Sequence, residues 1–510
     1  MKKNNIMNTK YIWLLVILLG FTACNEIEDV LEDNNVLPAA ELPALTAGSA
    51  NFSTYVSIGN SLTSGFTDNA LFIAAQENSF PNMLSQKFAM VGGGTFTQPL
   101  MNDNIGGIAL GGTRILEPRL VFGGAGPVPL ESIIGPVTVT TDLVVNNPTG
   151  PFNNMGVPGA ASFHLLAPGY GNAMNLPSAA NPYFVRMTGA TPNATMLEMA
   201  LAQSPTFVSL WIGNNDVLGY ATGGASAGAP TPQPMFNGSI DAITGALQNA
   251  NVQGVMANIP YLTSLAYFTT VGHNVIPLDA GTAGAVNGAY APYNAGIQQA
   301  FAFLVANTPM TQEQADAEIA LRTIMFEAAP NNAVVIMDEG LTDLTAINPQ
   351  LVSMRQANAD DLLILPSSTF IGTEAVPGNP LSVNGVAIPL ADNWVLVPSE
   401  QDEIKTAIDN FNAKLQSVAS SLGFAYVDAN ALLTQLATGG IMSNDYTLNA
   451  NLVTGGVFSL DGVHLTARGY ALTANEMMKA IDVTYGSNFE ASGNLLDLGD
   501  YPTNYHPTLQ

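Results

Sequence analysis

One serine near the start of the chain occupies a position from which it could act as a nucleophile. Ser61 lies in the segment Gly-Asn-Ser-Leu-Thr-Ser-Gly of residues 59–65, directly after the β-rich run 53–58. Where a strand passes into a helix, a serine hydroxyl is exposed at the carboxyl end of the strand, and its backbone N–H lies at a helix N-terminus that favours developing negative charge. The alternative interpretation is a structural turn, because Gly, Asn and Ser are common turn residues.

An acid and a histidine close together in the sequence could supply the base. Asp461 and His464 are separated by Gly-Val and stand immediately before a predicted final helix over residues 466–481. Across such a turn the carboxylate can accept a hydrogen bond from the imidazole, which fixes the tautomer and stabilises the imidazolium. The alternative is a turn that leads into the helix and contains an incidental histidine. The remaining histidines are interpreted as structural or exposed: His164, His273 and His506.

Two further motifs offer hydrogen-bond donors. Gly159 follows a proline in the segment 153–160, and its backbone N–H can point into a cleft. Asn215 belongs to the run Gly-Asn-Asn-Asp of residues 213–216, which ends the apolar run 207–212. Polar side chains at the carboxyl end of a strand are where α/β sheets place ligands. Taken singly, the Gly159 motif is explained equally well by a turn, and a capping role at the next helix is the favoured interpretation of the Asn215 motif.

The elements that must position these residues alternate between strand and helix. The apolar runs 207–212 and 252–259 predict buried strands, residues 401–422 predict an amphipathic helix, and residues 424–427 predict another strand. This alternation predicts an α/β fold with a parallel sheet that is covered by helices on both faces.

Two long stretches interrupt this pattern: the first is rich in Gly, Pro and Asn, and the second has a less clear order of elements and ends in turn-rich sequence. Residues 91–151 and 261–398 are expected to form two large loop-rich insertions. Within the second, residues 311–328 predict a helix and residues 333–337 predict a strand. Long loops at the carboxyl edge of a sheet commonly shape a binding site, so the insertions could form its walls or a lid, or serve only as structural padding.

Taken together, the four motifs resemble the ordered Ser, Gly, Asn and His blocks of the SGNH hydrolases, also called the GDSL family. The resemblance implies a three-layer α/β/α sandwich with a central parallel sheet, the flavodoxin-like SGNH fold, formed by a single domain over residues 52–482. It implies that Ser61 is the nucleophile, His464 the base and Asp461 the orienting acid. The oxyanion hole would be formed by the backbone N–H groups of Ser61 and Gly159 and the side-chain amide of Asn215.

The activity that the resemblance implies is ester hydrolysis through an acyl-enzyme, without a cofactor. The substrate would be a small-molecule or lipid ester, as for a carboxylesterase or lipase. Two alternatives remain open: a carbohydrate O-acetylesterase, and a non-catalytic surface-binding lipoprotein on the same scaffold. The second alternative is motivated by Asn60, which replaces the Asp of the family's Gly-Asp-Ser-Leu block.

The N-terminus predicts export and lipid attachment. Lysines precede the apolar run 11–23, which is too short to span a bilayer and is typical of a signal-peptide core. Its end, Phe-Thr-Ala-Cys, resembles the lipobox of bacterial lipoproteins, so we expect a lipoprotein signal peptide over residues 1–23 and lipidation of Cys24. The alternative is an ordinary secretory signal. An acidic, Pro-rich tether over residues 24–51 would follow, and residues 483–510 would form a C-terminal tail. This predicts a lipid-anchored protein of the bacterial cell envelope, in the outer membrane.

The composition excludes several other classes of function. Acidic residues number 39 against 13 basic ones, giving a net charge of −26, which disfavours nucleic acid as a partner. The chain has a single Cys and 4 His without metal-binding spacing, so we expect neither a disulfide framework nor a metal site. With 47% hydrophobic residues and 10% charged ones, the chain can bury a large core.

Overall fold

The computed structural model describes residues 41–509 except residue 380 and residues 444–445. The predicted signal peptide and Cys24 lie outside the described residues. The chain divides into two compact units, Met1–Ala44 with Ala491–Gly493, and Leu45–Glu490 with Asn494–Gln510. The second unit contains every element discussed below. Among the residues described, no helix combines the length and apolarity needed to cross a bilayer.

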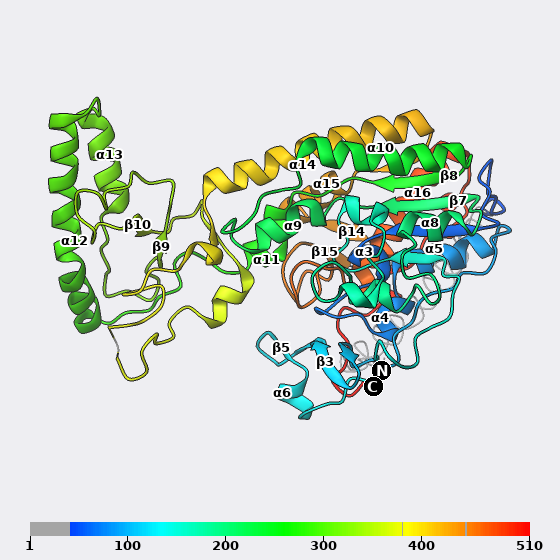
Figure 1. The fold of residues 1–510 in the computed structure, drawn as a ribbon, viewed down its shortest axis with the longest axis horizontal. Coiled ribbons are helices and arrows are strands. Elements are labelled where there is room, and N and C mark those ends of the chain that lie inside the picture. Colours follow the sequence, from blue (N-terminus) through cyan, green and yellow to red (C-terminus); the bar gives the residue numbers. More distant parts are fainter. Residues whose placement is uncertain (1–40, 380, 444–445, 510) are drawn as a thin grey trace, which may run out of the picture. The chain divides into compact units, whose positions relative to one another are not determined.

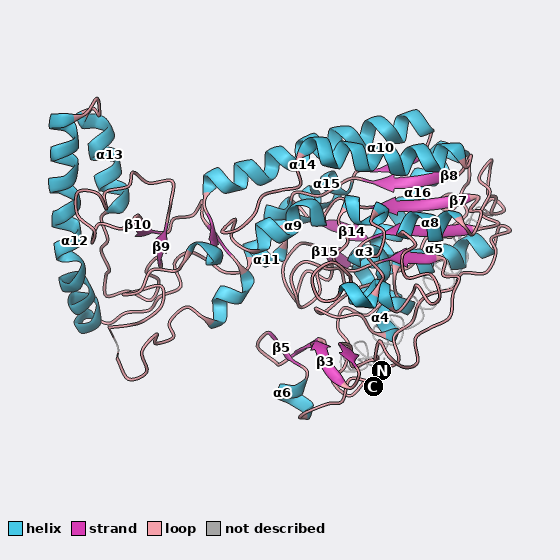
Figure 2. Ribbon diagram, viewed as in Figure 1, coloured by secondary structure: helices cyan, strands magenta, loops and turns pink. Residues whose placement is uncertain are grey.

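The second unit is built on a five-stranded parallel sheet (Figure 2). Its spatial order is β13-β8-β7-β1-β6. Numbered among themselves along the chain, these strands have the order 2-1-3-4-5 that is found in flavodoxin-like sheets. The strand order therefore reverses between β1 and β7, and ligands of such sheets bind outside the carboxyl ends of the strands at this point. The strands are β1 (Tyr55–Gly59), β6 (Asn154–Gly156), β7 (Phe207–Trp211), β8 (Gln253–Ala257) and β13 (Ala425–Val427).

Two pairs of long helices cover the sheet (Figure 1): α5 (Phe80–Ala89) with α16 (Ala467–Tyr485), and α10 (Gln233–Asn249) with α14 (Pro398–Leu422). Phe207 of β7 packs against the rings of Phe88 and Tyr485, on α5 and α16, at 5.7 Å each. The rings of Phe236 and Phe411 stack at 3.9 Å between α10 and α14. The observed architecture is thus a mixed α/β fold with a central parallel sheet. Residues 401–422, predicted to be an amphipathic helix, form most of α14.

The remaining elements of the core are short. Residues 91–151 contain two antiparallel hairpins, one of β2 and β3 and the other of β4 and β5. The strands are β2 (Ile108–Leu110), β3 (Thr113–Leu116), β4 (Leu120–Phe122), β5 (Pro127–Pro129), β14 (Ile441–Ser443) and β15 (Tyr446–Leu448). The helices are α3 (Ser61–Ser64), α4 (Ile73–Glu77), α6 (Glu131–Ile134), α7 (Pro182–Val185), α8 (Met196–Leu201), α9 (Asn215–Thr222), α11 (Ala266–Thr269) and α15 (Ala429–Thr438), with 3₁₀ turns η1 (Ser162–Leu166), η2 (Ala173–Asn175), η3 (Leu262–Ser264) and η6 (Leu498–Asp500).

The expectation of a loop-rich second insertion is wrong for residues 280–307, which form one long helix. Residues 261–398 contain this helix, α12 (Ala280–Asn307), which was not predicted, and a hydrophobic cluster of their own. The helix α13 (Gln312–Arg322) falls within the helix predicted over residues 311–328. Gly and Pro residues within α12 favoured a loop interpretation, but burial of one helix face outweighs their low helix propensity. That face carries Ala283, Val286, Tyr290, Tyr293, Ile297 and Phe301. The insertion also holds β9 (Val335–Met337), β10 (Met354–Gln356), β11 (Leu362–Leu363), β12 (Val395–Leu396), η4 (Leu365–Thr369) and η5 (Asp392–Trp394).

Candidate active site

Ser61 is the first residue of α3, immediately beyond the carboxyl end of β1. Asn60 caps this helix, because its Oδ1 accepts a hydrogen bond of 3.0 Å from the Leu62 N–H. Gly59 is needed for the tight turn, since a side chain there would collide with the Trp211 carbonyl oxygen of β7 and with Thr63. The hydroxyl of Ser61 is thus fixed at the point where the strand order reverses, and the residue retains 6% of its surface exposed.

Asp461, His464 and Ser61 form a continuous chain of hydrogen bonds. His464 Nε2 lies 2.9 Å from Ser61 Oγ, and His464 Nδ1 lies 2.9 Å from Asp461 Oδ2. Gly462 has φ +73° and approaches the backbone of Tyr267 so closely that a Cβ at this position would lie 2.8 Å from its nitrogen. The Tyr267 N–H donates to the Gly462 carbonyl at 2.9 Å, which anchors the loop that carries the histidine.

The carboxylate of Asp461 is held by several donors. Its Oδ1 accepts from the backbone N–H groups of Val463 and His464 at 2.9 and 2.8 Å, and its Oδ2 accepts from the Asn69 N–H at 2.8 Å. Burial alone would raise the pKa of Asp461, but the charge of His464, its side-chain hydrogen bond and the backbone N–H groups of His464 and Val463 lower it well below its usual range. The carboxyl group therefore stays ionised and faces the imidazole.

A second buried carboxyl group, which sequence reasoning missed, lies behind this loop. Asp68 Oδ1 accepts from the Leu460 N–H at 3.0 Å, and the Asp68 N–H donates to Ser459 Oγ at 3.1 Å. Burial is the main cause that raises the pKa of Asp68 to about 7; the Leu460 hydrogen bond lowers it, Asp461 raises it and Arg119 lowers it. Nothing in the spacing of residues 68 and 461 indicates this arrangement, because the contacts join segments far apart in the chain.

The predicted oxyanion donors follow the two strands that flank β1. Gly59 lies opposite Gly156 of β6 and Trp211 of β7, so all three loops begin at one edge of the sheet. Gly159 is exposed and has φ +82°. Asn215 is partly buried, and its Nδ2 donates to the Ala160 carbonyl at 2.9 Å. An amide nitrogen carries two hydrogens, so this bond uses one of the two side-chain N–H groups of Asn215.

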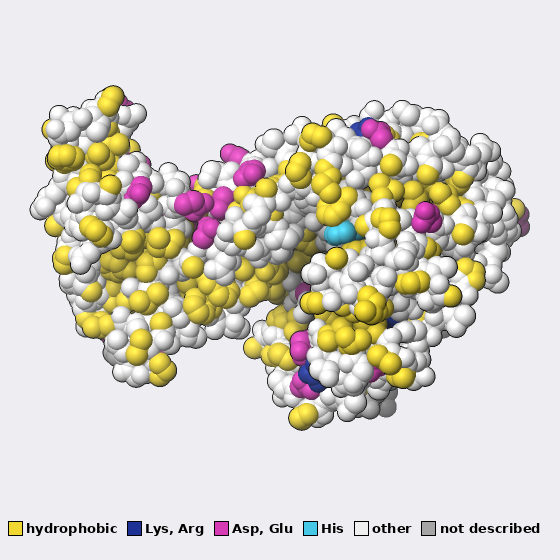
Figure 3. All heavy atoms as spheres, in the orientation of Figure 1, with side chains coloured by type: hydrophobic (Ala, Val, Ile, Leu, Met, Phe, Trp, Pro, Cys, Tyr) yellow, Lys and Arg dark blue, Asp and Glu magenta, His cyan; other side chains and the backbone are white. Residues whose placement is uncertain are grey.

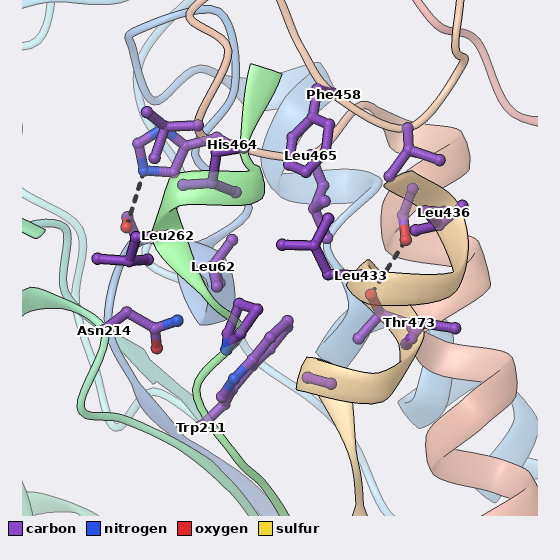
Figure 4. Close-up of a pocket in the computed structure, with 18 of the residues that line it drawn as sticks. Leu62, Trp211, Asn214, Leu262, Leu433, Leu436, Phe458, His464, Leu465 and Thr473 are labelled. Atoms are coloured by element: carbon purple, nitrogen blue, oxygen red, sulfur yellow. Dashed lines mark hydrogen bonds between the residues drawn. The ribbon is translucent and has the colours of Figure 1, made fainter. Parts of the chain in front are cut away.

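Asn214 is a further polar residue of the site that was not singled out from the sequence. It is 6% exposed and lines the pocket beside Ser61 (Figure 4). Its Oδ1 accepts from Asn60 Nδ2 at 3.2 Å. Asn60 thus connects the helix of Ser61 to the loop after β7. An aspartate could not donate this hydrogen bond when ionised.

An apolar pocket opens beside Ser61 and His464, with a cavity volume of about 70 Å³. Most of its wall comes from α15, from the loop before His464, from α16 and from residues after β8. Its apolar lining includes Leu62, Trp211, Leu262, Leu265, Leu433, Leu436, Val457, Phe458 and Leu472 (Figure 4). The serine hydroxyl therefore lies at the border between a polar hydrogen-bond network and an apolar cavity.

Three carboxylates elsewhere in the described part of the chain lie close enough to hold a cation. Oxygen atoms of Glu339, Asp392 and Glu400 all lie within 4.8 Å of one another. Burial, followed by the neighbouring carboxylates, raises the pKa of Asp392 to about 6. Burial and the neighbouring carboxylates raise the pKa of Glu400 to about 8, against a hydrogen bond from the Val397 N–H that lowers it. Their separation in the chain explains why no metal-binding spacing was visible in the sequence.

Comparison with known proteins does not identify a family for this chain. No protein-family model matches the chain, and no curated protein matches it. A solved structure with similarity is that of an extracellular lipase from Streptomyces rimosus, at 11% sequence identity and a TM-score of 0.29, with 86% of this chain and 100% of the lipase covered. A likeness at this level carries no argument about function, which must be inferred from the site itself.

Proposed function

We propose that this protein is a serine ester hydrolase of the SGNH type that acts through an acyl-enzyme. The observation that carries the proposal is the hydrogen-bonded chain from Asp461 through His464 to Ser61, with 2.9 Å at both imidazole nitrogens. The hydroxyl at its end adjoins a pocket at the carboxyl edge of the sheet, where α/β folds bind ligands. A nucleophile, a base and an orienting acid in this order are the groups that acyl transfer requires.

In the proposed reaction, His464 Nε2 takes the proton of Ser61 as Oγ attacks the ester carbonyl. The oxyanion is stabilised by the backbone N–H groups of Ser61 and Gly159 and by the Asn215 amide. The imidazolium then protonates the leaving alcohol. A water molecule, deprotonated by the same imidazole, attacks the acyl-enzyme, and the carboxylic acid leaves as Ser61 regains its proton. Asp461 remains ionised and stabilises the imidazolium in both halves of the reaction.

The test is turnover of p-nitrophenyl acetate together with labelling by a fluorophosphonate probe. We expect wild-type protein to do both and Ser61→Ala to lose both, with kcat lowered on the order of 10⁴- to 10⁶-fold. Ser421→Ala, on the exposed side of α14, is the matched control and keeps both activities. Wild-type protein that neither turns over the ester nor takes up the probe would contradict the proposal and favour a binding lipoprotein on this scaffold.

We also propose that the enzyme is anchored to the cell envelope through a lipidated Cys24. The support is the Phe-Thr-Ala-Cys sequence at the end of the apolar run, where the single Cys of the chain stands. Mass spectrometry of the protein purified from membranes is expected to find a diacylated N-terminal cysteine. An unmodified N-terminus at another residue would refute this anchor without affecting the proposed chemistry.

A further inference from the structure

We infer that the pocket beside Ser61 receives the aliphatic acyl chain of the ester, and that Leu433 and Leu436 of α15 limit its length. This inference rests on the proposed function and specifies its substrate class as esters of short to medium fatty acids. It distinguishes such esters from acetylated carbohydrates, which require no space for a chain on the acyl side.

The chemistry of the lining favours a hydrocarbon. Apart from Ser61 and His464, the polar side chains that line the pocket are those of Asn214 and Thr473. The Thr473 hydroxyl donates to the Gly469 carbonyl at 3.1 Å, and Asn214 Oδ1 accepts from Asn60. A sugar placed here would leave most of its hydroxyl groups without partners, at a cost for each buried group. A methylene chain loses no hydrogen bond on entering.

The pocket extends from the catalytic groups toward α15. In Figure 4, His464 and Asn214 lie on one side, and Leu433, Leu436 and Thr473 lie on the other. Leu433 and Leu436 are 5% and 4% exposed, one turn apart on the same helix. A chain whose carbonyl carbon is at Ser61 would therefore run toward these two leucines, which close the far end.

The volume sets the scale of the chain. The cavity of about 70 Å³ is several times the roughly 10–15 Å³ that a single water needs on the same measure. It thus has room for several methylene groups but not for a long fatty acid. We expect the best acyl group to have about four to eight carbons, with kcat/KM rising about fourfold for each methylene buried until the pocket is full.

The experiment measures kcat/KM for p-nitrophenyl esters from acetate to palmitate in the full mature chain. Leu433→Trp fills the far end and is expected to shift the optimum to shorter acyl groups, whereas Leu436→Ala enlarges it and shifts the optimum to longer ones. Opposite shifts from two variants cannot both arise from damaged folding. Thr434→Trp adds the same bulk to the exposed side of α15 and leaves the optimum unchanged.

Hydrolysis of the acetate ester tests the proposed function separately from the inference about the acyl pocket. If acetate is hydrolysed in a Ser61-dependent way but neither leucine variant changes the acyl-length profile, the pocket does not hold the acyl chain and the inference fails, while the proposed function stands. A second series keeps the acetyl group and lengthens the alcohol. If the leucine variants change that profile instead, the pocket takes the leaving group and the inference is likewise overturned. If no ester is hydrolysed, the proposed function itself fails.

Discussion

Two regions of this molecule bury charged groups, and they do so differently. At the edge of the sheet, the network around Asp461 ends at the hydroxyl of Ser61, which adjoins an apolar pocket. In the second insertion, Arg355 lies between Asp338 and Asp361, with nitrogen–oxygen distances of 2.6 Å to each, and all three residues are buried. The first network leaves a reactive atom at a cavity, whereas the ion pairs of the second satisfy one another.

The difference shows why burial of charge alone does not identify a functional site. A buried ion pair removes both charges from water and requires close mutual compensation. A catalytic network must also hold one group ready for a substrate, beside a space that the substrate can occupy. Hydrophobic side chains are frequent on the face shown in Figure 3, and Lys and Arg are few. Variants in the two regions are therefore expected to change different properties. Variants at the sheet edge should change activity, and variants in the second insertion should change stability.

Among variants that leave Ser61, His464 and Asp461 in place, the largest effect on activity is expected at the proposed oxyanion donor. Asn215→Ala removes a side-chain N–H from the proposed oxyanion hole and should lower kcat by about 10²- to 10³-fold, with a smaller change in KM. Steady-state kinetics with p-nitrophenyl butyrate measure this, and the denaturation midpoint checks the fold. Asn214→Ala is the comparison variant, because the Asn214 side chain bonds to Asn60 and lines the pocket but is not a proposed oxyanion donor. An unchanged kcat in Asn215→Ala would remove this residue from the oxyanion hole.

In the insertion, Arg355→Met is expected to cost stability rather than activity. The substitution leaves Asp338 and Asp361 buried without their cation, which should lower the free energy of unfolding by about 3–5 kcal/mol. Urea denaturation followed by circular dichroism measures the loss. Lys405→Met breaks the exposed ion pair with Asp409 and should cost less than about 1 kcal/mol. A large fall in kcat of folded Arg355→Met protein would contradict the division between the two regions.

The smallest effect concerns Asp68, which bonds to the loop before Asp461 at residues Leu460 and Ser459. Because its pKa is raised to about 7 in the folded protein, the folded state binds an extra proton between the ordinary aspartate range and neutral pH. Its contribution to stability is therefore complete in acid and is lost as the pH rises through about 7. Asp68→Asn should remove this decline, on the order of 1–3 kcal/mol between pH 4 and 8.

Urea denaturation of wild type and Asp68→Asn across that pH range measures the effect. Equal slopes of stability against pH in the two proteins would show that Asp68 does not titrate in this way. The groups that face it, Asp461 and Arg119, are unchanged in the variant, so a difference in slope reports on Asp68.

Local patterns account for what could be predicted. The buried strands 207–212 and 252–259 and the helix over 401–422 have strong hydrophobic patterns, and they correspond to β7, β8 and α14. Asp461 and His464 are only three positions apart in the sequence, so their pairing is likewise local. By contrast, α12 was missed because its Gly and Pro content concealed a face spaced at three and four residues that only its packing stabilises.

The sequence by itself determined the alternation of strands and helices, the order of the four motifs and the residue types that acyl transfer needs. Tertiary structure alone decided that Ser61 meets an imidazole 403 positions away, that Asp68 and Asn69 support the loop of Asp461, and that leucines of α15 enclose the pocket. The physical reason is that hydrogen-bond capacity and hydrophobicity belong to individual residues and show in local patterns. Which groups come within bonding distance depends on how strands far apart in the chain are ordered in the sheet.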